Sequence, residues 1–325
     1  MEILEVVNLS KHYELKSGLF DKCLGSKTGS VIKSVGGVNF SLKAGEILGI
    51  AGESGCGKST ACMLITNLIK PTEGMVKYKG RNISEFDKLE MRDYQRHVQM
   101  IFQDPYESLN PRFTTFDLVA EPLRALGYGS KEKIADRVME TLEEAGLDGQ
   151  QYRNRYPHQM SGGERQRVGI ACALALKPEI VIADEPLSML DVSIRAGILD
   201  LIRDLSRKMN FSSIYVSHDL SILSNISDRL LIMYLGKVME IGKSEDVIKD
   251  PQHPYAQALI SAVSIPDPRY KRPIPDIKGE VSQPIDPPPG CRFEPRCTRA
   301  LDICKKIEPP MKEISDGHCA ACHLL

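Results

Sequence analysis

The sequence predicts an α/β fold with a mostly parallel central sheet. Short apolar runs rich in β-branched residues alternate with segments whose apolar residues recur at helical spacing. Chains that alternate in this way build parallel sheets through strand–helix–strand crossovers. One transition carries a glycine-rich loop between an apolar run and a helical pattern, and the segment at about 104–175 has helical patterns only. We therefore expect a parallel core with a helical insertion.

Four runs are expected to be strands buried on both faces, because they are short, apolar and bounded by polar residues. They are Glu46–Ala51, His97–Gln103, Ile180–Asp184 and Ser212–Ser217. Two helices are expected from apolar residues three and four positions apart. The first carries Ala61, Leu64, Ile65, Leu68 and Ile69, and the second carries Ile194, Ile198, Leu201, Ile202, Leu205 and Met209.

Composition excludes several classes of protein. The 325 residues include 42 Lys and Arg against 43 Asp and Glu, a formal net charge of −1. A near-neutral chain lacks the basic excess of a broad nucleic-acid surface, so no nucleic-acid partner is expected. No apolar run reaches the roughly 18 residues of a membrane-spanning helix. The first residues lack the basic and apolar regions of a secretory signal, so we expect a cytosolic protein.

Proline divides the chain unevenly. Residues 265–290 hold 8 of the 20 prolines. Because proline fixes φ and lacks an amide proton, this stretch is expected to be an extended linker rather than helix or central strand. It separates a body at 1–264 from a small Cys-rich module at 291–325.

The glycine-rich loop satisfies the pattern G-x-x-x-x-G-K-[ST] and predicts a nucleotide site. Glycines let successive backbone N–H groups converge on phosphate oxygens, and the following helix adds its positive N-terminal dipole. Lys58 is expected to reach the β- and γ-phosphates, and the Ser59 hydroxyl to ligate Mg²⁺. The nucleotide-binding residues expected here are Gly52, Ser54, Gly55, Cys56, Gly57, Lys58, Ser59 and Thr60.

An acidic pair follows a second apolar strand. Asp184 ends the run IVIA, so its carboxylate is expected at the C-terminal edge of the sheet, where open α/β folds bind ligands. There it can hold Mg²⁺ through water. Glu185 comes next and is expected to orient and deprotonate a water molecule as general base.

The segment Ser161–Arg167, SGGERQR, resembles the signature motif of ABC-transporter ATPases. In that family the motif contacts the γ-phosphate of ATP bound to the partner subunit, which implies roles for Ser161, Gly162, Gly163 and Glu164. The resemblance implies a P-loop ABC ATPase fold: a RecA-like parallel sheet core, an antiparallel β subdomain, a helical subdomain and a small Cys-rich C-terminal extension. It also implies ATP and Mg²⁺ as cofactors.

Further short motifs agree with this family in order and spacing. Tyr13 resembles the aromatic that stacks on adenine, and Gln103 resembles the glutamine that senses Mg²⁺ and the attacking water. Ser188–Asp191 resembles the D-loop, which implies a nucleotide contact for Asp191, and His218 resembles the switch histidine that reaches the γ-phosphate. The implied catalytic residues are Glu185, His218, Gln103 and Lys58, and the implied Mg²⁺ ligands are Ser59, Gln103 and Asp184.

Three longer segments resemble the oligopeptide/dipeptide/nickel importer ATPases: Asp104–Arg112, Tyr156–Gly163 and His253–Leu259. The sequence SLNPR at Ser108–Arg112 and the insert after Tyr13 resemble the second of the two ATPases that such importers pair together, the dipeptide type. The resemblance implies a homologous second ATPase subunit in a heterodimer, two membrane permease subunits and an external substrate-binding protein. It implies a peripheral position on the cytoplasmic face of the cell membrane.

This sequence departs from the family at Leu187 and Met189, where Thr and Ala are usual. Bulkier side chains there could alter how the D-loop meets the partner, so equal activity of the two ATP sites is in question.

Five of the nine cysteines lie in the last 35 residues: Cys291, Cys297, Cys304, Cys319 and Cys322. Cytosolic thiols stay reduced, so disulfides are not expected, and a metal could hold a segment with little apolar content. Four thiolates suit a [4Fe–4S] cluster or Zn²⁺, and the spacing does not choose between these and unmetallated thiols. The resemblance implies a [4Fe–4S] cluster on Cys291, Cys297, Cys304 and Cys322, with Cys319 as an alternative fourth ligand.

The remaining cysteines, Cys23, Cys56, Cys62 and Cys172, are expected to be structural. Cys319–His323 also matches the c-type haem pattern, but haem attachment requires export.

The predicted function is the ATP-hydrolysing motor of a di- or oligopeptide importer. Alternatives are the same motor for nickel or oligosaccharide uptake, and a soluble ABC ATPase outside transport. A soluble ABC ATPase is disfavoured, because soluble ABC ATPases usually carry two ATPase domains or a long coiled-coil insert, and this sequence shows neither. A third interpretation is an electron carrier built on the Cys-rich module. It rests on one four-cysteine site, and the sequence carries no motif for a second redox cofactor.

Overall fold

The computed structural model of the chain describes residues 1–14, 30–263, 277–279 and 285–325. Two compact units form. The helical unit contains Met1, Leu42–Glu46 and Ile83–Val216, and the phosphate-loop unit contains Glu2–Ser41, Ile47–Asn82 and Ser217–Leu325. Most of the insert after Tyr13, including Cys23, and most of the proline-rich linker lie outside the described residues.

The helical unit contains three parallel strands: β6 (Val98–Ile101), β7 (Ile180–Asp184) and β8 (Ser212–Ser217). β7 lies between the other two. Every residue of β7 and β8 is buried, as expected for apolar strands covered on both faces. The strand prediction is thereby confirmed for these three runs, and burial on both faces is confirmed for β7 and β8; in β6, Gln99 and Met100 are only partly buried.

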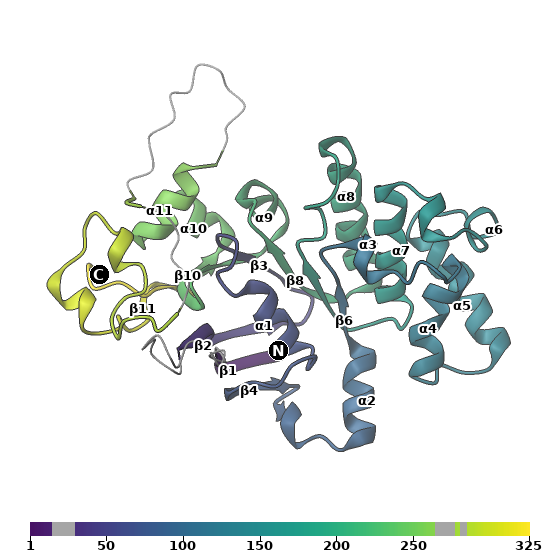
Figure 1. Cartoon of the computed structure of the whole chain (residues 1–325), viewed down its shortest axis with the longest axis horizontal. Coiled ribbons are helices and arrows are strands. Elements are labelled where there is room, and N and C mark those ends of the chain that lie inside the picture. Colours follow the sequence, from purple (N-terminus) through teal and green to yellow (C-terminus); the bar gives the residue numbers. More distant parts are fainter. Residues whose placement is uncertain (15–29, 264–276, 280–284) are drawn as a thin grey trace, which may run out of the picture. The chain divides into compact units, whose positions relative to one another are not determined.

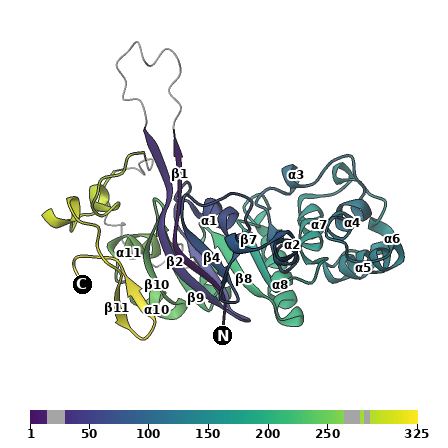
Figure 2. The same cartoon turned by 90° about the horizontal axis from the view of Figure 1, so that it is seen from below.

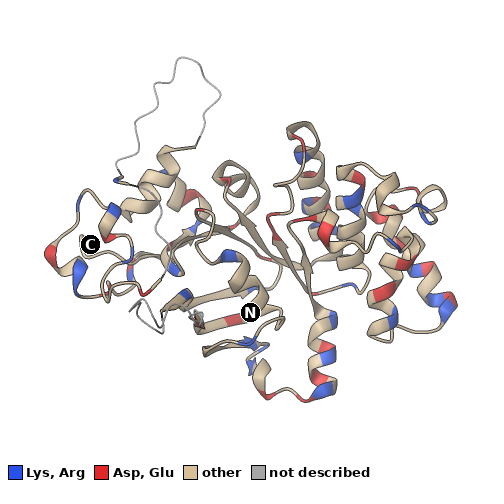
Figure 3. Cartoon of the chain, in the orientation of Figure 1, with Lys and Arg blue, Asp and Glu red and all other residues tan. Residues whose placement is uncertain are grey.

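The remainder of the helical unit is helical. The helices are α2 (Lys88–His97), α3 (Pro105–Ser108), α4 (Thr115–Ala125), α5 (Lys131–Glu144), α6 (Gly149–Tyr152), α7 (Gly162–Leu174) and α8 (Val192–Met209). Figure 1 shows α4, α5 and α7 gathered together. Their apolar faces form one core that includes Val119, Leu123, Val138, Leu142 and Val168. Figure 3 shows charges of both signs along α2 and α5.

The phosphate-loop unit contains an antiparallel sheet in the order β2-β1-β4-β5. Its strands are β1 (Glu2–Glu14), β2 (Val31–Lys43), β4 (Glu73–Tyr78) and β5 (Arg81–Asn82). Figure 2 shows β1 and β2 as two long strands side by side.

A second set of strands in this unit has the order β3-β9-β10-β12-β11. They are β3 (Ile47–Ala51), β9 (Arg229–Tyr234), β10 (Lys237–Lys243), β12 (His318–Ala320) and β11 (Lys312–Ser315). β3 and β9 are parallel, and the other pairs are antiparallel. The helices are α1 (Lys58–Ile65), α9 (Leu220–Ile226), α10 (Ser244–Lys249) and α11 (Pro254–Ser261).

The helix after the phosphate loop is shorter than the apolar spacing predicts. α1 ends at Ile65, and Leu68 is 57 % exposed, so its assignment to a buried helix face was wrong. Asn67 adopts a left-handed conformation with φ of 57°, a common way for a chain to leave a helix. The second predicted helix is confirmed as α8, which buries Ile198, Ile202 and Leu205.

The Cys-rich segment, which we define as Cys291–Leu325, joins the sheet of its own unit. Ala320 and Cys319 of β12 pair with Glu240 and Ile241 of β10. Glu240 is fully buried, and its carboxylate lies 2.7 Å from Nε2 of His318 and accepts the backbone N–H of His253. The boundaries of body, linker and module stay a prediction, because most of the linker is not described.

Along the described ranges, no helix combines the length and apolar character needed to cross a lipid bilayer.

Candidate active site

The phosphate loop runs from the end of β3 to the first residue of α1. Gly57 has φ of 100°, and a Cβ atom there would lie 2.1 Å from the backbone oxygen of Ser34. Only glycine fits this combination of a left-handed conformation and close backbone contact. The loop therefore delivers Lys58 and Ser59 into the first turn of a helix, where N–H groups point at an incoming anion.

Lys58 is folded into its own loop. The side chain is 4 % exposed, and Nζ donates to the backbone oxygens of Gly52 at 2.8 Å and Glu53 at 3.1 Å. Its Nζ also lies 3.9 Å from Sγ of Cys56. Burial raises the pKa of the Cys56 thiol, although Lys58 opposes the shift. A raised pKa lowers the fraction of reactive thiolate.

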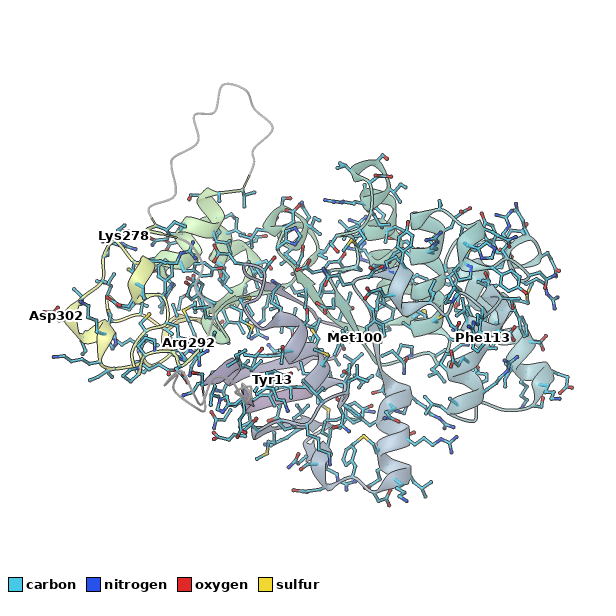
Figure 4. The ribbon with its side chains drawn as sticks, in the orientation of Figure 1. Tyr13, Met100, Phe113, Lys278, Arg292 and Asp302 are labelled. Atoms are coloured by element: carbon cyan, nitrogen blue, oxygen red, sulfur yellow. The ribbon has the colours of Figure 1, made fainter. Side chains whose placement is uncertain are left out.

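Of the other predicted residues of this unit, Thr60, Ser54 and Gly55 belong to the loop, and Tyr13 and His218 lie elsewhere in the sequence. Ser34 donates to Oγ1 of Thr60 at 2.9 Å, while Ser54 and Gly55 are exposed at the tip of the loop. Tyr13 is 40 % exposed near the end of β1, and Nζ of Lys11 lies 5.3 Å from the centre of its ring (Figure 4). The ring is therefore available for stacking. His218 is exposed at the junction between β8 and α9.

In the helical unit, the acidic pair ends β7 as predicted. Asp184 is 4 % exposed, and Glu185 adopts a left-handed conformation with φ of 44°. The backbone of Glu185 donates to the oxygen of Val216 at 3.0 Å, and its carbonyl accepts the hydroxyl of Ser188 at 3.0 Å. A non-glycine residue held in this conformation costs of order 1–3 kcal/mol and is found most often at functional sites.

Gln103 and Glu185 are brought together across 82 residues of sequence. The amide Nε2 of Gln103 donates to Oε2 of Glu185 at 3.4 Å. A carboxylate and an amide side by side at a strand end can together hold and orient one water molecule, which is what a general base requires.

The signature motif forms the N-terminus of α7. Ser161 caps the helix: its hydroxyl accepts the N–H of Glu164 at 3.3 Å, and the Glu164 carboxylate accepts the N–H of Ser161 at 2.7 Å. Tyr152 donates a further hydrogen bond to Glu164. These hydrogen bonds, that of Tyr152 first, lower the pKa of the Glu164 carboxyl. Ser161 itself is exposed, while Gly163 is buried against Ile194.

The two unusual D-loop residues have different surroundings. Leu187 is buried at 4 % exposure, whereas Met189 is 54 % exposed. Asp191 is exposed at the N-terminus of α8, where its side chain makes no capping hydrogen bond. Of the two replacements, Met189 is therefore the one that presents its side chain to solvent.

Four of the five cysteines in the Cys-rich segment line one cavity: Cys291, Cys297, Cys304 and Cys322. Burial raises the pKa of Cys291 to about 12; a backbone hydrogen bond from Phe293 opposes this shift, and the other three thiols add to it. Burial also raises the pKa of Cys297 and Cys322, again with contributions from neighbouring thiols. Cys319 lines a different cavity, and Glu313 rather than another thiol adds to the effect of burial on its pKa. The structure therefore separates Cys319 from the other four.

Within the part of the chain that the structure describes, no group of three or more His, Cys, Asp and Glu side chains is arranged to hold a metal ion. The metal predicted for the Cys-rich segment therefore stays a hypothesis.

Sequence reasoning missed two residues that contact the phosphate loop. Arg296 donates to both carboxylate oxygens of Glu53, at 2.7 and 3.2 Å, and the hydroxyl of Tyr255 accepts the Glu53 N–H at 3.1 Å. No sequence signal could have found them, because 202 and 243 residues separate the partners.

A phosphate loop at a strand–helix junction, with an Asp-Glu pair ending a buried parallel strand, defines a P-loop nucleoside triphosphatase. Comparison with known proteins narrows this class. Residues 35–188 match the profile of the family described as "ABC transporter", and residues 239–304 match "Oligopeptide/dipeptide transporter, C-terminal region".

The chain is 45 % identical over 325 residues to the oligopeptide transport ATP-binding protein AppF of Bacillus subtilis, covering 99 % of this chain and 97 % of that protein. It is 43 % identical to a probable peptide ABC transporter ATP-binding protein of Sinorhizobium fredii, covering 99 % of this chain and 90 % of that protein. A solved dimeric ATP-binding cassette, MJ0796, in a post-hydrolysis state with ADP and Pi, superposes with a TM-score of 0.63 at 31 % identity, covering 74 % of this chain and 98 % of that one.

The chain belongs to the family of ATP-binding subunits of oligopeptide/dipeptide ABC transporters. It is an ABC-type ATPase, and ATP with Mg²⁺ fits its site.

Proposed function

We propose that this chain is the ATP-hydrolysing subunit of an importer that takes up di- and oligopeptides through membrane permease subunits. One observation carries the proposal: the likeness to peptide-transport ATP-binding proteins extends over 99 % of the chain. It includes a C-terminal region described for oligopeptide/dipeptide transporters as well as the ATPase portion common to many ABC proteins.

Each residue of the site has a proposed role. The phosphate loop from Gly52 to Thr60 wraps the phosphates, Lys58 neutralises the β- and γ-phosphates, and Tyr13 stacks on adenine. Glu185 is the general base, with Gln103 orienting the attacking water; their 3.4 Å contact supports this pairing. For Mg²⁺ we propose Ser59, Gln103 and Asp184, and for γ-phosphate sensing His218; these assignments rest on sequence and family membership.

The signature motif is proposed to act on a second subunit. Ser161 is exposed at the N-terminus of a 13-residue helix, so its hydroxyl and the first N–H groups of α7 suit a phosphate presented from outside the chain. ATP would then be an interface ligand. Closure of two subunits is favoured only while the γ-phosphate bridges them, and hydrolysis releases the bridge.

The proposed assembly places the chain on the cytoplasmic face of the membrane. It would pair with a homologous second ATPase subunit, this chain being the dipeptide-type member of the pair. The pair would drive two permease subunits that receive substrate from an external binding protein, and the segment after Gln103 would pass closure to the permease.

Copurification tests the assembly. A tagged chain extracted from native membranes in mild detergent should carry integral-membrane permease subunits and a second ATPase. Purification as a soluble ATPase without membrane partners would contradict the proposal.

Reconstitution with the copurified subunits and binding protein then tests the substrate. ATP hydrolysis should rise with di- or oligopeptides and stay at its basal rate with nickel chelates or oligosaccharides; stimulation by one of the latter alone would replace the peptide assignment.

We further propose that Cys291, Cys297, Cys304 and Cys322 hold a [4Fe–4S] cluster. Their shared cavity supports this, because four thiols that face one space can bind one cluster. When bound, the cluster would supply a cross-link and a one-electron redox centre.

Anaerobic purification tests the cluster. Iron and sulfide should be present in equal amounts, with a broad visible absorbance that is lost on oxidation. Cys304→Ser should remove it, while Cys319→Ser, a matched substitution outside the cavity, should leave it intact. A colourless protein that contains zinc, or loss of iron in Cys319→Ser alone, would contradict the assignment.

A further inference from the structure

Two arginines of the Cys-rich segment contact the phosphate loop or residues next to it. Arg292 and Arg296 are 7 % and 6 % exposed, although guanidinium groups are rarely buried without partners. Arg292 directly follows Cys291, and Arg296 directly precedes Cys297. Both cysteines line the four-cysteine cavity, so each arginine is next in sequence to a residue that lines that cavity.

Arg296 holds the loop by a side-chain pair. Its guanidinium binds the Glu53 carboxylate through two nitrogens, at 2.7 and 3.2 Å, in the fork-to-fork arrangement that fixes both direction and distance. Glu53 is the second residue of the phosphate loop and is 25 % exposed. The pair also cancels a negative charge that would otherwise stand beside bound phosphates.

Arg292 holds the loop through an intermediate turn. Its guanidinium donates to the backbone oxygens of Leu235 and of Lys33, the latter at 3.1 Å. The next residue in the turn between β9 and β10, Gly236, donates its N–H to the backbone oxygen of Cys56 at 2.7 Å. Figure 4 labels Arg292 where the yellow Cys-rich segment approaches the strands of its own unit.

Aromatic rings pack beside Arg296, whose guanidinium carbon lies 5.7 Å from the centre of the Tyr234 ring. Phe293 is 1 % exposed, and its ring lies 5.3 Å from those of Tyr234 and Tyr255 and 5.7 Å from that of His253. Tyr255 in turn accepts the N–H of Glu53. The arginines, the rings and the loop thus form one packed network within the phosphate-loop unit, which we call the loop brace.

We propose that Arg296 and Arg292 are positioning residues for ATP binding. From the Cys-rich segment they hold the phosphate loop in its binding conformation, so the packing of this segment around the four-cysteine cavity influences the affinity for ATP. The proposal rests on the phosphate-loop role given under "Proposed function". A glycine-rich loop that is ordered before binding loses less conformational freedom on binding, which raises affinity without any direct contact with the nucleotide.

A double-mutant cycle in the full-length chain tests the Arg296 arm, with the Kd for ATP, the KM for ATP and kcat as readouts. Arg296→Ala should raise Kd and KM roughly tenfold with little change in kcat, because it removes ordering and leaves the Glu53 charge unpaired. Glu53→Gln should raise them about threefold, and adding Arg296→Ala to it should change them less than about twofold. Arg296→Lys should recover part of the affinity.

Lys306→Ala is the control, since it removes one charge from an exposed position of the same segment and should leave Kd unchanged. Unaltered Kd in Arg296→Ala, or an equal effect of Arg296→Ala in both backgrounds, would overturn the proposal. Thermal unfolding of each variant separates loss of fold from loss of positioning, and Glu53→Gln breaks the same pair without altering the Cys-rich segment.

The cysteine arm is tested by the same titration. Cys304→Ser should weaken ATP binding, and adding Arg296→Ala to it should change the Kd for ATP little further. Cys319→Ser should leave the Kd for ATP unchanged. Unchanged ATP affinity in Cys304→Ser would overturn this arm. Lys58→Ala separates the proposals: if it binds ATP normally, the phosphate-loop assignment itself fails, whereas weak binding by Lys58→Ala with normal binding by Arg296→Ala refutes the loop brace alone.

Discussion

The phosphate loop and the signature motif are both small, glycine-containing segments at helix N-termini, but they are held in different ways. The phosphate loop contacts Ser34, Gly236, Tyr255 and Arg296, all distant in sequence. The signature motif is held by a capping box whose two members are three residues apart, together with a hydrogen bond from Tyr152, which is 12 residues from Glu164. Local contacts form with the helix itself, whereas the loop depends on the packing of its whole unit.

This difference makes the two motifs vulnerable to different changes. A distant substitution can loosen the phosphate loop without touching any of its residues. The signature motif should respond mainly to changes in its own cap. The substitutions below test this contrast, beginning with the residue whose loss should cost most.

Glu185→Gln should have the largest effect. The side chain keeps its size and its neighbour Gln103 but can no longer accept a proton, so kcat should fall roughly 10²–10⁴-fold while ATP still binds. Steady-state hydrolysis and equilibrium ATP binding measure the two properties. Glu245→Gln, the same substitution at an exposed position on α10, is the control. Near wild-type turnover in Glu185→Gln would remove Glu185 as the base.

Gly57→Ala should damage the phosphate loop through its distant contact. The new Cβ would lie 2.1 Å from the oxygen of Ser34, so the loop must shift, and ATP affinity should fall by about 10²-fold. Gly169→Ala, on α7 where a Cβ atom would meet nothing within 4 Å, should instead stabilise the protein by about 0.5–1 kcal/mol. Equal ATP affinity in the two variants would show that the loop tolerates the shift.

Ser161→Ala and Ser130→Ala compare two serine caps in the helical unit. Each hydroxyl accepts an N–H in the first turn of its helix, α7 or α5, so each substitution should cost about 1 kcal/mol of stability. Only Ser161→Ala should also reduce ATP hydrolysis, because only its cap belongs to the signature motif. Denaturant unfolding and hydrolysis rates measure the two effects. If both variants lose hydrolysis equally, Ser161 acts only as a helix cap.

His253 should make the phosphate-loop unit sensitive to acid. Burial, with a smaller contribution from Arg299, lowers the pKa of His253 to about 3, below its ordinary value of 6.5. Between these values the unfolded chain binds a proton that the folded chain does not. The free energy of unfolding should therefore fall as pH drops from 6.5 toward 3, by up to about 1.4 kcal/mol per pH unit.

His253→Asn tests this contribution with the helix cap preserved. Nδ1 of His253 accepts the N–H of Tyr255 at the start of α11, and Asn is a good N-cap. Unfolding free energies measured between pH 7 and about pH 4 should depend less on pH in the variant. The same slope in both proteins would assign the acid sensitivity to other groups.

Sequence alone predicted the parts of the fold that follow from local pattern. The apolar runs that became β3, β7 and β8, and the helical spacing that became α8, need no distant information. The end of α1 was missed because the apolar residue Leu68 continues the helical spacing past Ile65, while the left-handed Asn67 ends the helix.

The residues of the site also fall into two groups, those that local sequence identifies and those that only the structure identifies. The pattern that contains Lys58, the acidic pair at Glu185 and the signature serine Ser161 were identified from local spacing. The Arg296–Glu53 pair could not be identified, because a lone Arg beside a cysteine and a lone Glu in a loop carry no signal until folding brings them together. The separation of Cys319 from its four neighbours likewise depends on which strand it occupies.

Hydrogen–deuterium exchange in wild type and Arg296→Ala tests most directly whether the phosphate loop depends on distant contacts and the signature motif on local ones. Without nucleotide, amides of the phosphate loop should exchange at least about tenfold faster in the variant, while those of α7 should keep their wild-type rates. Unchanged exchange in the phosphate loop, or equal acceleration in the loop and α7, would contradict this account.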